Sequence, residues 1–200
     1  MSKRSSVSAP VLLVVMDGVG WRQETYGNAV HLAATPHLQW LQEQSSFCSL
    51  KAHGPYVGMG GEKDMGNSEV GHNVLGAGQV FMQGSSLVDK AIADESLFAT
   101  KAWQKALSLE KTQKTLHLIG LLSDGGVHSK LTHLFSLCQK AAESGLKKVR
   151  LHLLLDGRDV EDFTALDYVK KLEDFLVKLK NKTGCDLKIA SGGGRMHMTM

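Results

Sequence analysis

The amino-acid sequence predicts an α/β protein built around a parallel sheet. Short runs of apolar residues recur along the chain, and an Asp or Ser and then glycine follow each run. Stripes of apolar residues at three- and four-residue steps, typical of helices, lie between several of these runs. The chain has 200 residues, of which 42% are hydrophobic and 22% are charged, so it is long enough to bury a core.

The N-terminal region begins with a polar segment and continues with an apolar one. Residues 1–10 are Ser-rich and are expected to be disordered. Val11–Val15 form a continuous β-branched and leucine run, which predicts a strand buried on both faces. Asp17 comes directly after this run, where its carboxylate is either a turn former or a ligand for a hard metal ion.

The C-terminal half shows the clearest alternation of elements. Three apolar runs predict buried strands like the first: Thr115–Leu122, Val149–Leu155 and Leu187–Ala190. One apolar stripe from Leu131 to a stop at Gly145 predicts a helix, and a second stripe from Phe163 to Leu179 predicts another. This strand-helix-strand-helix-strand order requires parallel strands joined by right-handed crossovers.

Charged side chains follow the predicted strands at their carboxyl ends, where open α/β sheets bind ligands. They are Asp17, Asp124 with His128, Arg158 with Asp159, and Arg195. Two arginines at neighbouring strand ends suit a doubly anionic substrate, because a guanidinium group binds phosphate and carboxylate bidentately. From the residues alone, a salt-bridged surface loop is an equal alternative.

A glycine-rich stretch from residue 54 to residue 84 contains the candidate nucleophile, Ser68. Ser68 is expected to open a short helix that stops near Gly76, where backbone N–H groups and the helix dipole would stabilise a phosphate on its hydroxyl. The simpler alternative is a helix N-cap serine, which the residues alone favour. His72, four residues later, is a base or a capping and packing residue.

Composition excludes several other classes of protein. The formal net charge of +3 is mixed along the chain, so charge does not indicate nucleic-acid binding. The apolar run at Val11 is too short to span a membrane and does not resemble a signal peptide. Three widely spaced cysteines fit a reducing compartment, and no glycine run carries a Walker A motif or a complete dinucleotide fingerprint.

In chain order, these motifs resemble those of one enzyme family, cofactor-independent (2,3-bisphosphoglycerate-independent) phosphoglycerate mutase. The resemblance extends from about Val11 to the last residue, and the string Gly66–His72 is its most specific part. The motifs that carry it are Val14–Gly20, Gly27–Ala29, Ala34–Pro36, Met65–His72, Leu75–Gly78, Ser123–Ser129, Asp156–Asp159 and Gly194-Arg195.

The resemblance implies an alkaline-phosphatase-like parallel sheet domain that is interrupted by a second α/β phosphotransferase domain. Residues 11–84 are expected to be the first segment of the metal-binding phosphatase domain, and residues 85–200 the N-terminal part of the inserted, substrate-binding domain. The family's further substrate arginines, its substrate lysine and its Asp/His metal clusters are expected beyond residue 200. Residues 1–200 alone are therefore expected to be inactive.

The resemblance also implies site roles. Ser68 resembles the serine that takes the phosphoryl group from 3-phosphoglycerate, becomes phosphoserine, and returns the group to the 2-hydroxyl of glycerate. Asp17 and Ser68 resemble ligands of one of two Mn²⁺ ions, for which Mg²⁺ or Co²⁺ are the expected substitutes. The implied substrate-binding residues are His128, Arg158, Asp159 and Arg195.

Two alternatives to a glycolytic isomerase stay open from the sequence. A related metal-dependent phosphatase or phosphopentomutase would share the Asp-Gly strand end and a hydroxyl nucleophile, and a non-enzymatic binding module is the other. The expected partners are 3-phosphoglycerate and 2-phosphoglycerate, with no nucleic acid and no membrane. The full-length protein is expected to be a cytoplasmic monomer, or to lie in a peroxisome-like organelle if a targeting signal follows residue 200.

Overall fold

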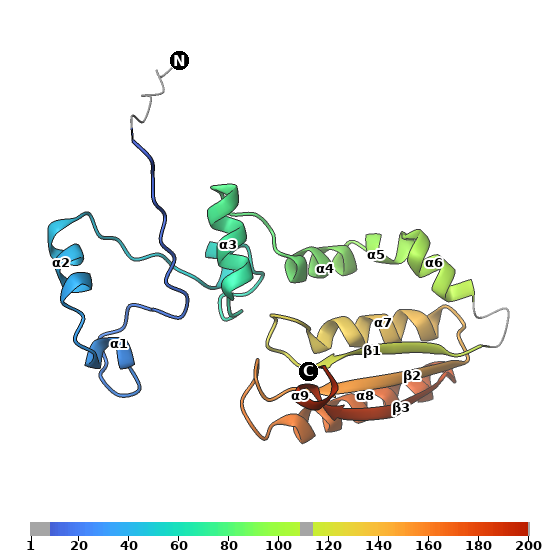
Figure 1. Ribbon diagram of the computed structural model, residues 1–200. Coiled ribbons are helices and arrows are strands. Elements are labelled where there is room, and N and C mark those ends of the chain that lie inside the picture. Colours follow the sequence, from blue (N-terminus) through green and yellow to red (C-terminus); the bar gives the residue numbers. More distant parts are fainter. Residues whose placement is uncertain (1–8, 109–113, 200) are drawn as a thin grey trace, which may run out of the picture. The chain divides into compact units, whose positions relative to one another are not determined.

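The computed structural model describes residues 9–108 and 114–199, and the chain divides into two compact units (Figure 1). The first unit is Met1–Leu50 and the second is Lys51–Met200. Residues 1–8, most of the segment predicted to be disordered, lie outside the described residues. The domain boundary predicted at residue 84 stays a prediction.

The first unit contains two helices, α1 (Ala29–Leu32) and α2 (Pro36–Gln44). Asn28 begins α1: its side-chain oxygen accepts a hydrogen bond from the backbone N–H of His31, and its amide nitrogen donates to the carbonyls of Arg22 and Glu24. A capping side chain satisfies a backbone donor that the first helical turn leaves without a partner. Pro36 opens α2, where its missing N–H is not needed.

The prediction of a buried strand at Val11–Val15 is wrong for this structure. The segment has no strand hydrogen bonding, and its side chains are 46–86% exposed. A strand forms only where a neighbouring strand pairs with its backbone groups. The described residues of the first unit contain helices, turns and irregular chain, so the segment has no strand beside it to pair with.

The second unit contains helices and a sheet in alternation. It opens with a 3₁₀ turn, η1 (Gly54–Val57), and helix α3 (Ser68–Ala77). Three helices follow: α4 (Gly84–Ala93), α5 (Ser96–Ala99) and α6 (Lys101–Leu107). The remaining elements are β1 (Leu116–Leu122), α7 (Leu131–Glu143), β2 (Lys148–Leu155), α8 (Ala165–Thr183), β3 (Asp186–Gly194) and α9 (Arg195–Met198).

The three strands pair in parallel in the order β1-β2-β3, which confirms the predicted arrangement of strands and crossover helices. β3 extends past the predicted end at Ala190, because Gly192–Gly194 pair with Leu153–Leu155 of β2. Gly145 follows α7 and Gly184 follows α8, and both have a positive φ. These are the positions where a helix stop favours glycine.

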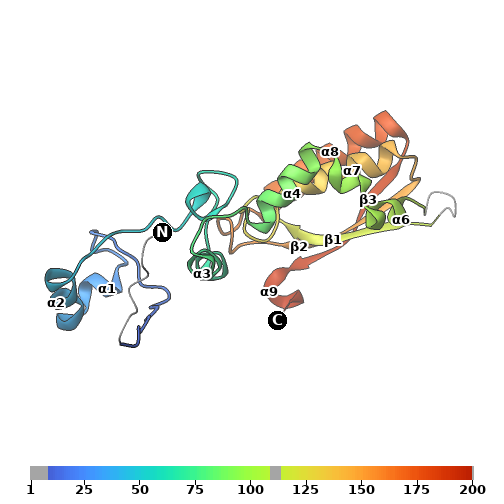
Figure 2. The ribbon, with the colours of Figure 1, turned by 90° about the horizontal axis from the view of Figure 1, so that it is seen from above.

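In the part of the chain that the structure describes, helices cover one face of this sheet and leave the other open. Strands in sequential order with right-handed crossovers carry both connecting helices to the same side, and α7 and α8 lie on one side in Figure 2. Val149, Leu151 and Leu153 face these helices and are buried. On the opposite face Ile119 is 75% exposed, so the expected burial on both faces is wrong for the described part of the chain.

The core of the second unit lies between the sheet and the two crossover helices. Leu122, Leu151 and Leu172 are almost completely buried, and each such side chain contributes roughly 2 kcal/mol. Phe135 of α7 stacks on Phe175 of α8 with ring centroids 4.1 Å apart. Cys138 is a free thiol in this core, and burial raises its pKa to about 12, so it acts as a small packing residue.

Helix α8 begins two residues later than the apolar stripe predicts. Phe163 lies outside the helix, fully exposed and with a φ of +65°, in the left-handed region that side chains rarely adopt. The acidic residues Glu161 and Asp162 therefore precede the helix, and Asp167 occupies its first turn. Within residues 9–108 and 114–199, no helix has the length and hydropathy to cross a bilayer.

Candidate active site

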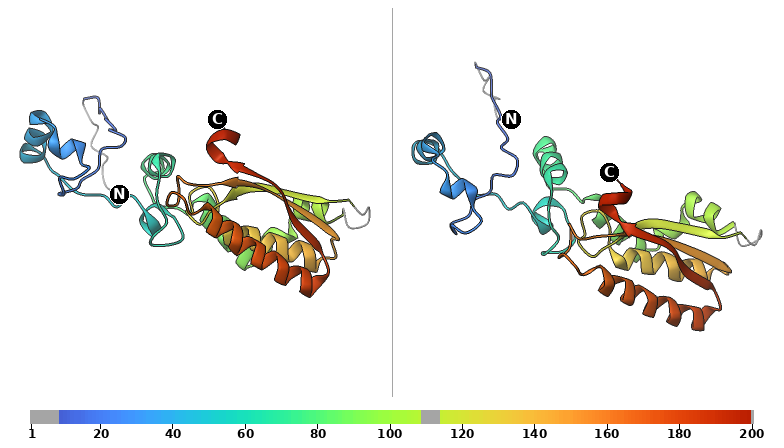
Figure 3. Two further views of the ribbon diagram at one scale, coloured as in Figure 1. Left: turned by 90° about the horizontal axis from the view of Figure 1, so that it is seen from below. Right: turned by 60° about the horizontal axis from the view of Figure 1, so that its bottom comes forward.

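The loops that follow β1 and β2 and the short helix after β3 lie at one end of the sheet (Figure 3). This is the carboxyl end of all three strands, because the strands are parallel. A glycine makes close approach of two of these loops feasible: a Cβ atom at Gly125 would lie 2.6 Å from the Cβ of Asp159. The loop after β1 therefore packs directly on the loop after β2.

Three of the predicted substrate residues meet at this edge. His128 Nδ1 lies 2.6 Å from Asp159 Oδ2, and Arg195 Nη1 donates to the same Asp159 oxygen at 2.9 Å. The side chain of Asp159 is 9% exposed, whereas that of His128 is 54% exposed. Asp159 thus holds a solvent-facing imidazole and a guanidinium group together, and both can face an anionic ligand.

Asp156, which is not among the predicted site residues, anchors this cluster. Its Oδ1 accepts hydrogen bonds from Arg195 Nη1 at 3.0 Å and from the backbone N–H groups of Gly157, Arg158 and Asp159. Burial would raise the pKa of Asp156, but hydrogen bonds from Ser123 and from these backbone groups outweigh it and hold the pKa well below its usual range. An Asp-Gly pair directly after a strand is the signal that could have found it.

Arg158 takes part through its backbone. Its N–H group donates to Asp156, and the residue is exposed in the loop after β2. The structure thus brings His128, Asp159 and Arg195 into one hydrogen-bonded cluster and leaves the Arg158 side chain facing solvent beside it. A guanidinium group has five N–H donors, and Arg195 uses two of them on carboxylates, which leaves donors for a ligand.

Ser68 is the first residue of α3 and is exposed. The residue that caps the helix is Asn67, whose side-chain oxygen accepts from the backbone N–H of Val70 at 2.8 Å, so the N-cap alternative for Ser68 is wrong. α3 continues to Ala77, and Gly78 with a φ of +64° ends it. The Ser68 hydroxyl therefore lies at the positive end of a ten-residue helix.

The contacts between His72 and Ser68 decide whether His72 is a base or a capping and packing residue. His72 Nδ1 lies 2.7 Å from the carbonyl oxygen of Ser68 and 3.2 Å from its hydroxyl oxygen. A carbonyl oxygen only accepts hydrogen bonds, so Nδ1 carries the proton and donates. Nδ1 then has no lone pair with which to remove the hydroxyl proton. His72 therefore supports the first turn of α3, and it does not act as the base for Ser68 through this atom.

Asp17 lies in the first unit, in a turn. Val19 N–H donates to the carbonyl of Met16 at 3.3 Å, and Gly18 has a φ of +81°. Positive φ at the third position of such a turn favours glycine, so Asp17-Gly18 acts as a turn former here. Within the part of the chain that the structure describes, no group of three or more His, Cys, Asp or Glu side chains could hold a metal ion.

Comparison with protein families identifies the chain. A model of the BPG-independent PGAM N-terminus matches residues 88–200. The chain belongs to the cofactor-independent phosphoglycerate mutase family. The resemblance drawn from the sequence motifs is therefore confirmed.

Longer proteins of this phosphoglycerate mutase family are similar in sequence to almost the whole of this chain. A probable 2,3-bisphosphoglycerate-independent phosphoglycerate mutase of Leptospira interrogans is 47% identical over 96% of this chain and 36% of the relative. The mutase of Trypanosoma brucei brucei is 47% identical over 95% of this chain and 35% of the relative. This chain therefore spans about a third of the length of these relatives, 36% of one and 35% of the other.

A solved structure supports the fold. The phosphoglycerate mutase of Leishmania mexicana, crystallised at low cobalt concentration, matches with a TM-score of 0.85 and 46% identity over 91% of this chain and 33% of that chain. The α/β fold class predicted from the sequence is therefore that of a phosphoglycerate mutase.

Proposed function

We propose that this chain provides the nucleophile and part of the substrate site of an isomerase that interconverts 3-phosphoglycerate and 2-phosphoglycerate without 2,3-bisphosphoglycerate. One observation carries the proposal. His128, Asp159 and Arg195 form a cluster at the carboxyl edge of the sheet, and the same compact unit carries an exposed serine at a helix start. Membership in the phosphoglycerate mutase family supports it.

The proposed chemistry passes one phosphoryl group through Ser68. The hydroxyl oxygen of Ser68 attacks the phosphorus of 3-phosphoglycerate, the bond to the 3-oxygen breaks, and that oxygen takes a proton. The glycerate then re-orients, and its 2-hydroxyl oxygen attacks the phosphoserine and releases Ser68 with a proton. Backbone N–H groups at the start of α3 favour the added negative charge.

The edge cluster would hold the rest of the substrate during both transfers. Arg195 is fixed by two carboxylates and presents its remaining N–H donors, and Arg158 adds a second guanidinium group from the neighbouring loop. Asp159 would orient Arg195 and His128, and the exposed imidazole of His128 would contact a substrate oxygen. Fixed donors at both ends of a small anion supply the orientation that the transfer requires.

Two Mn²⁺ ions, with Mg²⁺ or Co²⁺ as substitutes, are part of the proposal. When bound, they would act as Lewis acids on the serine and phosphoryl oxygens. Asp17 and Ser68 offer oxygen donors, the type that hard divalent cations prefer, so their chemistry fits. Two donors do not complete a site, and we propose that other parts of a longer protein provide the remaining ligands.

The test separates a mutase from a phosphatase. Full-length protein is incubated with 3-phosphoglycerate and Mn²⁺, and 2-phosphoglycerate and free phosphate are both measured. We expect 2-phosphoglycerate to form, phosphate to be found on Ser68 by mass spectrometry, and both to vanish in Ser68→Ala. Free phosphate without 2-phosphoglycerate would instead favour the related metal-dependent phosphatase, and an unphosphorylated, inactive protein would favour a binding module.

We further propose that the full-length protein is a cytoplasmic monomer with no nucleic-acid or membrane partner. Light scattering after size-exclusion chromatography measures its mass in solution. Cell fractionation followed by immunoblotting distinguishes the cytoplasm from a peroxisome-like organelle.

A further inference from the structure

Lys130 lies at the centre of an ion-pair network in the second unit. Its ammonium group is 2.7 Å from Asp89 of α4 and 3.2 Å from Asp64, which precedes α3. His133 of α7 contacts the second oxygen of Asp89 at 2.6 Å. We name Lys130, Asp64, Asp89 and His133 the Lys130 node. None of these residues belongs to the cluster at the sheet edge.

The Lys130 node is largely shielded from water. The side chains of Lys130, Asp64 and His133 are 16%, 18% and 17% exposed, and that of Asp89 is 38% exposed. Burial would lower the pKa of Lys130, but the two carboxylates outweigh it and raise the pKa. Lys130 therefore stays charged at neutral pH, and its removal would leave the poorly solvated carboxylate of Asp64 without its ammonium partner.

The node joins the segment before Ser68 to the loop that carries His128. Asp64 precedes Ser68 by four residues, and Lys130 follows His128 by two. The two segments also approach closely: a Cβ atom at Gly126 would lie 3.2 Å from the carboxyl group of Asp64. Asp64 is fixed in turn by the backbone N–H of Gly61, which donates to its Oδ2 at 3.0 Å.

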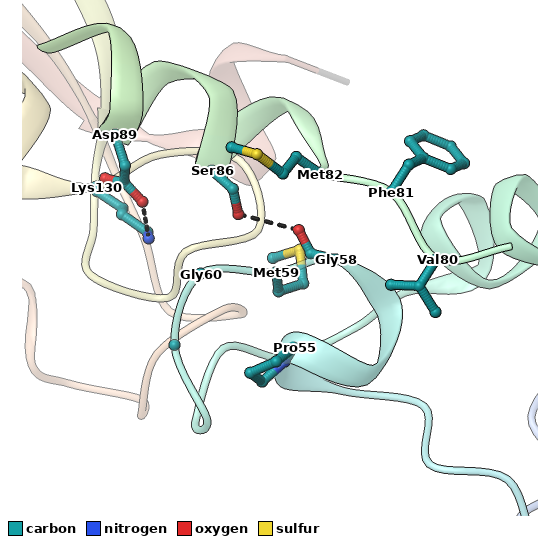
Figure 4. A pocket seen from close by; sticks show the side chains of 11 residues that line it. Pro55, Gly58, Met59, Gly60, Val80, Phe81, Met82, Ser86, Asp89 and Lys130 are labelled. Carbon is teal, nitrogen blue, oxygen red and sulfur yellow. Dashed lines mark hydrogen bonds and ion pairs between the residues drawn. The ribbon is translucent and has the colours of Figure 1, made fainter. Parts of the chain in front are cut away.

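Asp89 connects the Lys130 node to helix α4. Gly58 O accepts hydrogen bonds from Ser86 Oγ at 3.0 Å and from the backbone N–H of Gln83 at 2.9 Å, which ties the segment after η1 to the start of α4. Beside these contacts lies a pocket of about 730 Å³. Figure 4 shows Asp89 and Lys130 at one end of the pocket and Val80 and Phe81 at the other.

We propose that Lys130 is a positioning residue that holds the segment bearing Ser68 against the loop bearing His128. This inference rests on the proposed function. In that function a phosphoryl group passes between Ser68 and a substrate held at the sheet edge, and the transfer requires that the two segments be aligned. Two of the three N–H donors of Lys130 already bind carboxylates, so its role is structural alignment and not substrate binding.

The test uses the full-length protein with Lys130→Met, which keeps the length of the side chain and removes its charge. Hydrogen exchange should be faster in residues 54–67 by about tenfold, because the node no longer holds this segment. kcat should fall by about 10- to 100-fold, while KM for 3-phosphoglycerate stays within about twofold, because the substrate residues keep their contacts. Lys130→Arg should restore both, since its guanidinium group can bind the same two carboxylates.

The matched control is Lys140→Met in α7, the helix that follows Lys130: it removes an exposed ion pair to Glu95 and should behave as wild type. If Lys130→Met does not fold, Asp64→Asn takes its place and is judged by the same criteria. Exchange and kcat equal to those of Lys140→Met would overturn the inference, and so would a raised KM with unchanged kcat. A wild-type protein without mutase activity would refute the proposed function, while hydrogen exchange still tests the node.

Discussion

Asp156 is the residue that most constrains the candidate site. Its side chain is 1% exposed and accepts three backbone hydrogen bonds, so rotation would take these bonds away from a buried carboxylate. Arg195, 15% exposed, is held by this fixed carboxylate and by Asp159. A guanidinium group that is already oriented loses little further freedom when an anion binds.

Asp156→Asn should lower the free energy of unfolding at pH 7 by about 1–3 kcal/mol, because charge-assisted hydrogen bonds are lost. The folded protein holds the pKa of Asp156 below its ordinary value of 3.8, so this stabilisation is complete above that pH and is lost as the pH falls through the lowered pKa. Urea unfolding at pH 7, 4 and 2.5, followed by circular dichroism, measures it. Asp174→Asn, on the exposed face of α8, is the control, and an equal pH dependence in both variants would contradict the prediction.

Arg195→Lys should raise KM for 3-phosphoglycerate about tenfold or more in the full-length protein, because an ammonium group cannot bind two oxygens in a planar fork. Arg150→Lys provides the comparison, since Arg150 also pairs with an aspartate, Asp186, but at the amino end of the sheet. Steady-state kinetics on both variants are the measurement. An unchanged KM in Arg195→Lys would show that this arginine is structural.

At the scale of elements, the loop between β2 and α8 combines a rigid start with a strained end. Asp156 organises its first turn, whereas Phe163 takes a left-handed backbone conformation with its ring fully in solvent. Left-handed backbone costs a residue with a side chain about 1 kcal/mol or more. No burial of the ring offsets this strain in the described structure.

Phe163→Gly should therefore raise the free energy of unfolding by about 1 kcal/mol, because glycine adopts positive φ without strain. Leu166→Gly is the matched control, for which the free energy of unfolding should change in the opposite direction. It replaces an exposed apolar residue of α8 and should lower the free energy of unfolding by about 1 kcal/mol. Thermal unfolding of both variants and of the wild type measures these changes in the free energy of unfolding. Equal destabilisation by the two substitutions would mean that Phe163 is not strained.

At the scale of the whole molecule, the chain spans only part of the length of its relatives. It spans 36% of the Leptospira interrogans relative, one face of its sheet is exposed at Ile119, and the segment Val11–Val15 has no strand beside it in the described structure. A metal site for hard cations needs several oxygen or nitrogen ligands. Asp17 and Ser68 are two candidates.

Residues 1–200 alone should show no mutase turnover with added Mn²⁺, because these two candidate ligands do not complete a metal site. The measurement compares purified residues 1–200 with its Ser68→Ala variant and with the full-length protein, each supplied with 3-phosphoglycerate. Any formation of 2-phosphoglycerate above the Ser68→Ala level by residues 1–200 would contradict the prediction.

Local patterns in the sequence were sufficient to predict the parallel sheet, its crossover helices and the edge where the charged residues gather. The parallel strands β1, β2 and β3 and the helices between them follow from apolar periodicity and glycine stops, which depend on neighbouring residues. The charged residues after β2 and β3 reach one edge because parallel strands end together. The motif around Ser68 was specific enough to indicate the family.

Only the tertiary structure decided the features that depend on residues far apart in the chain. Val11–Val15 has the composition of a strand, but a strand also needs a partner. Nothing in the sequence indicated that Asp156 pairs with Arg195, 39 positions away, or that Lys130 pairs with Asp64, 66 positions away. Periodicity records which face of an element is apolar, whereas hydrogen bonds and ion pairs between distant segments depend on how those faces pack.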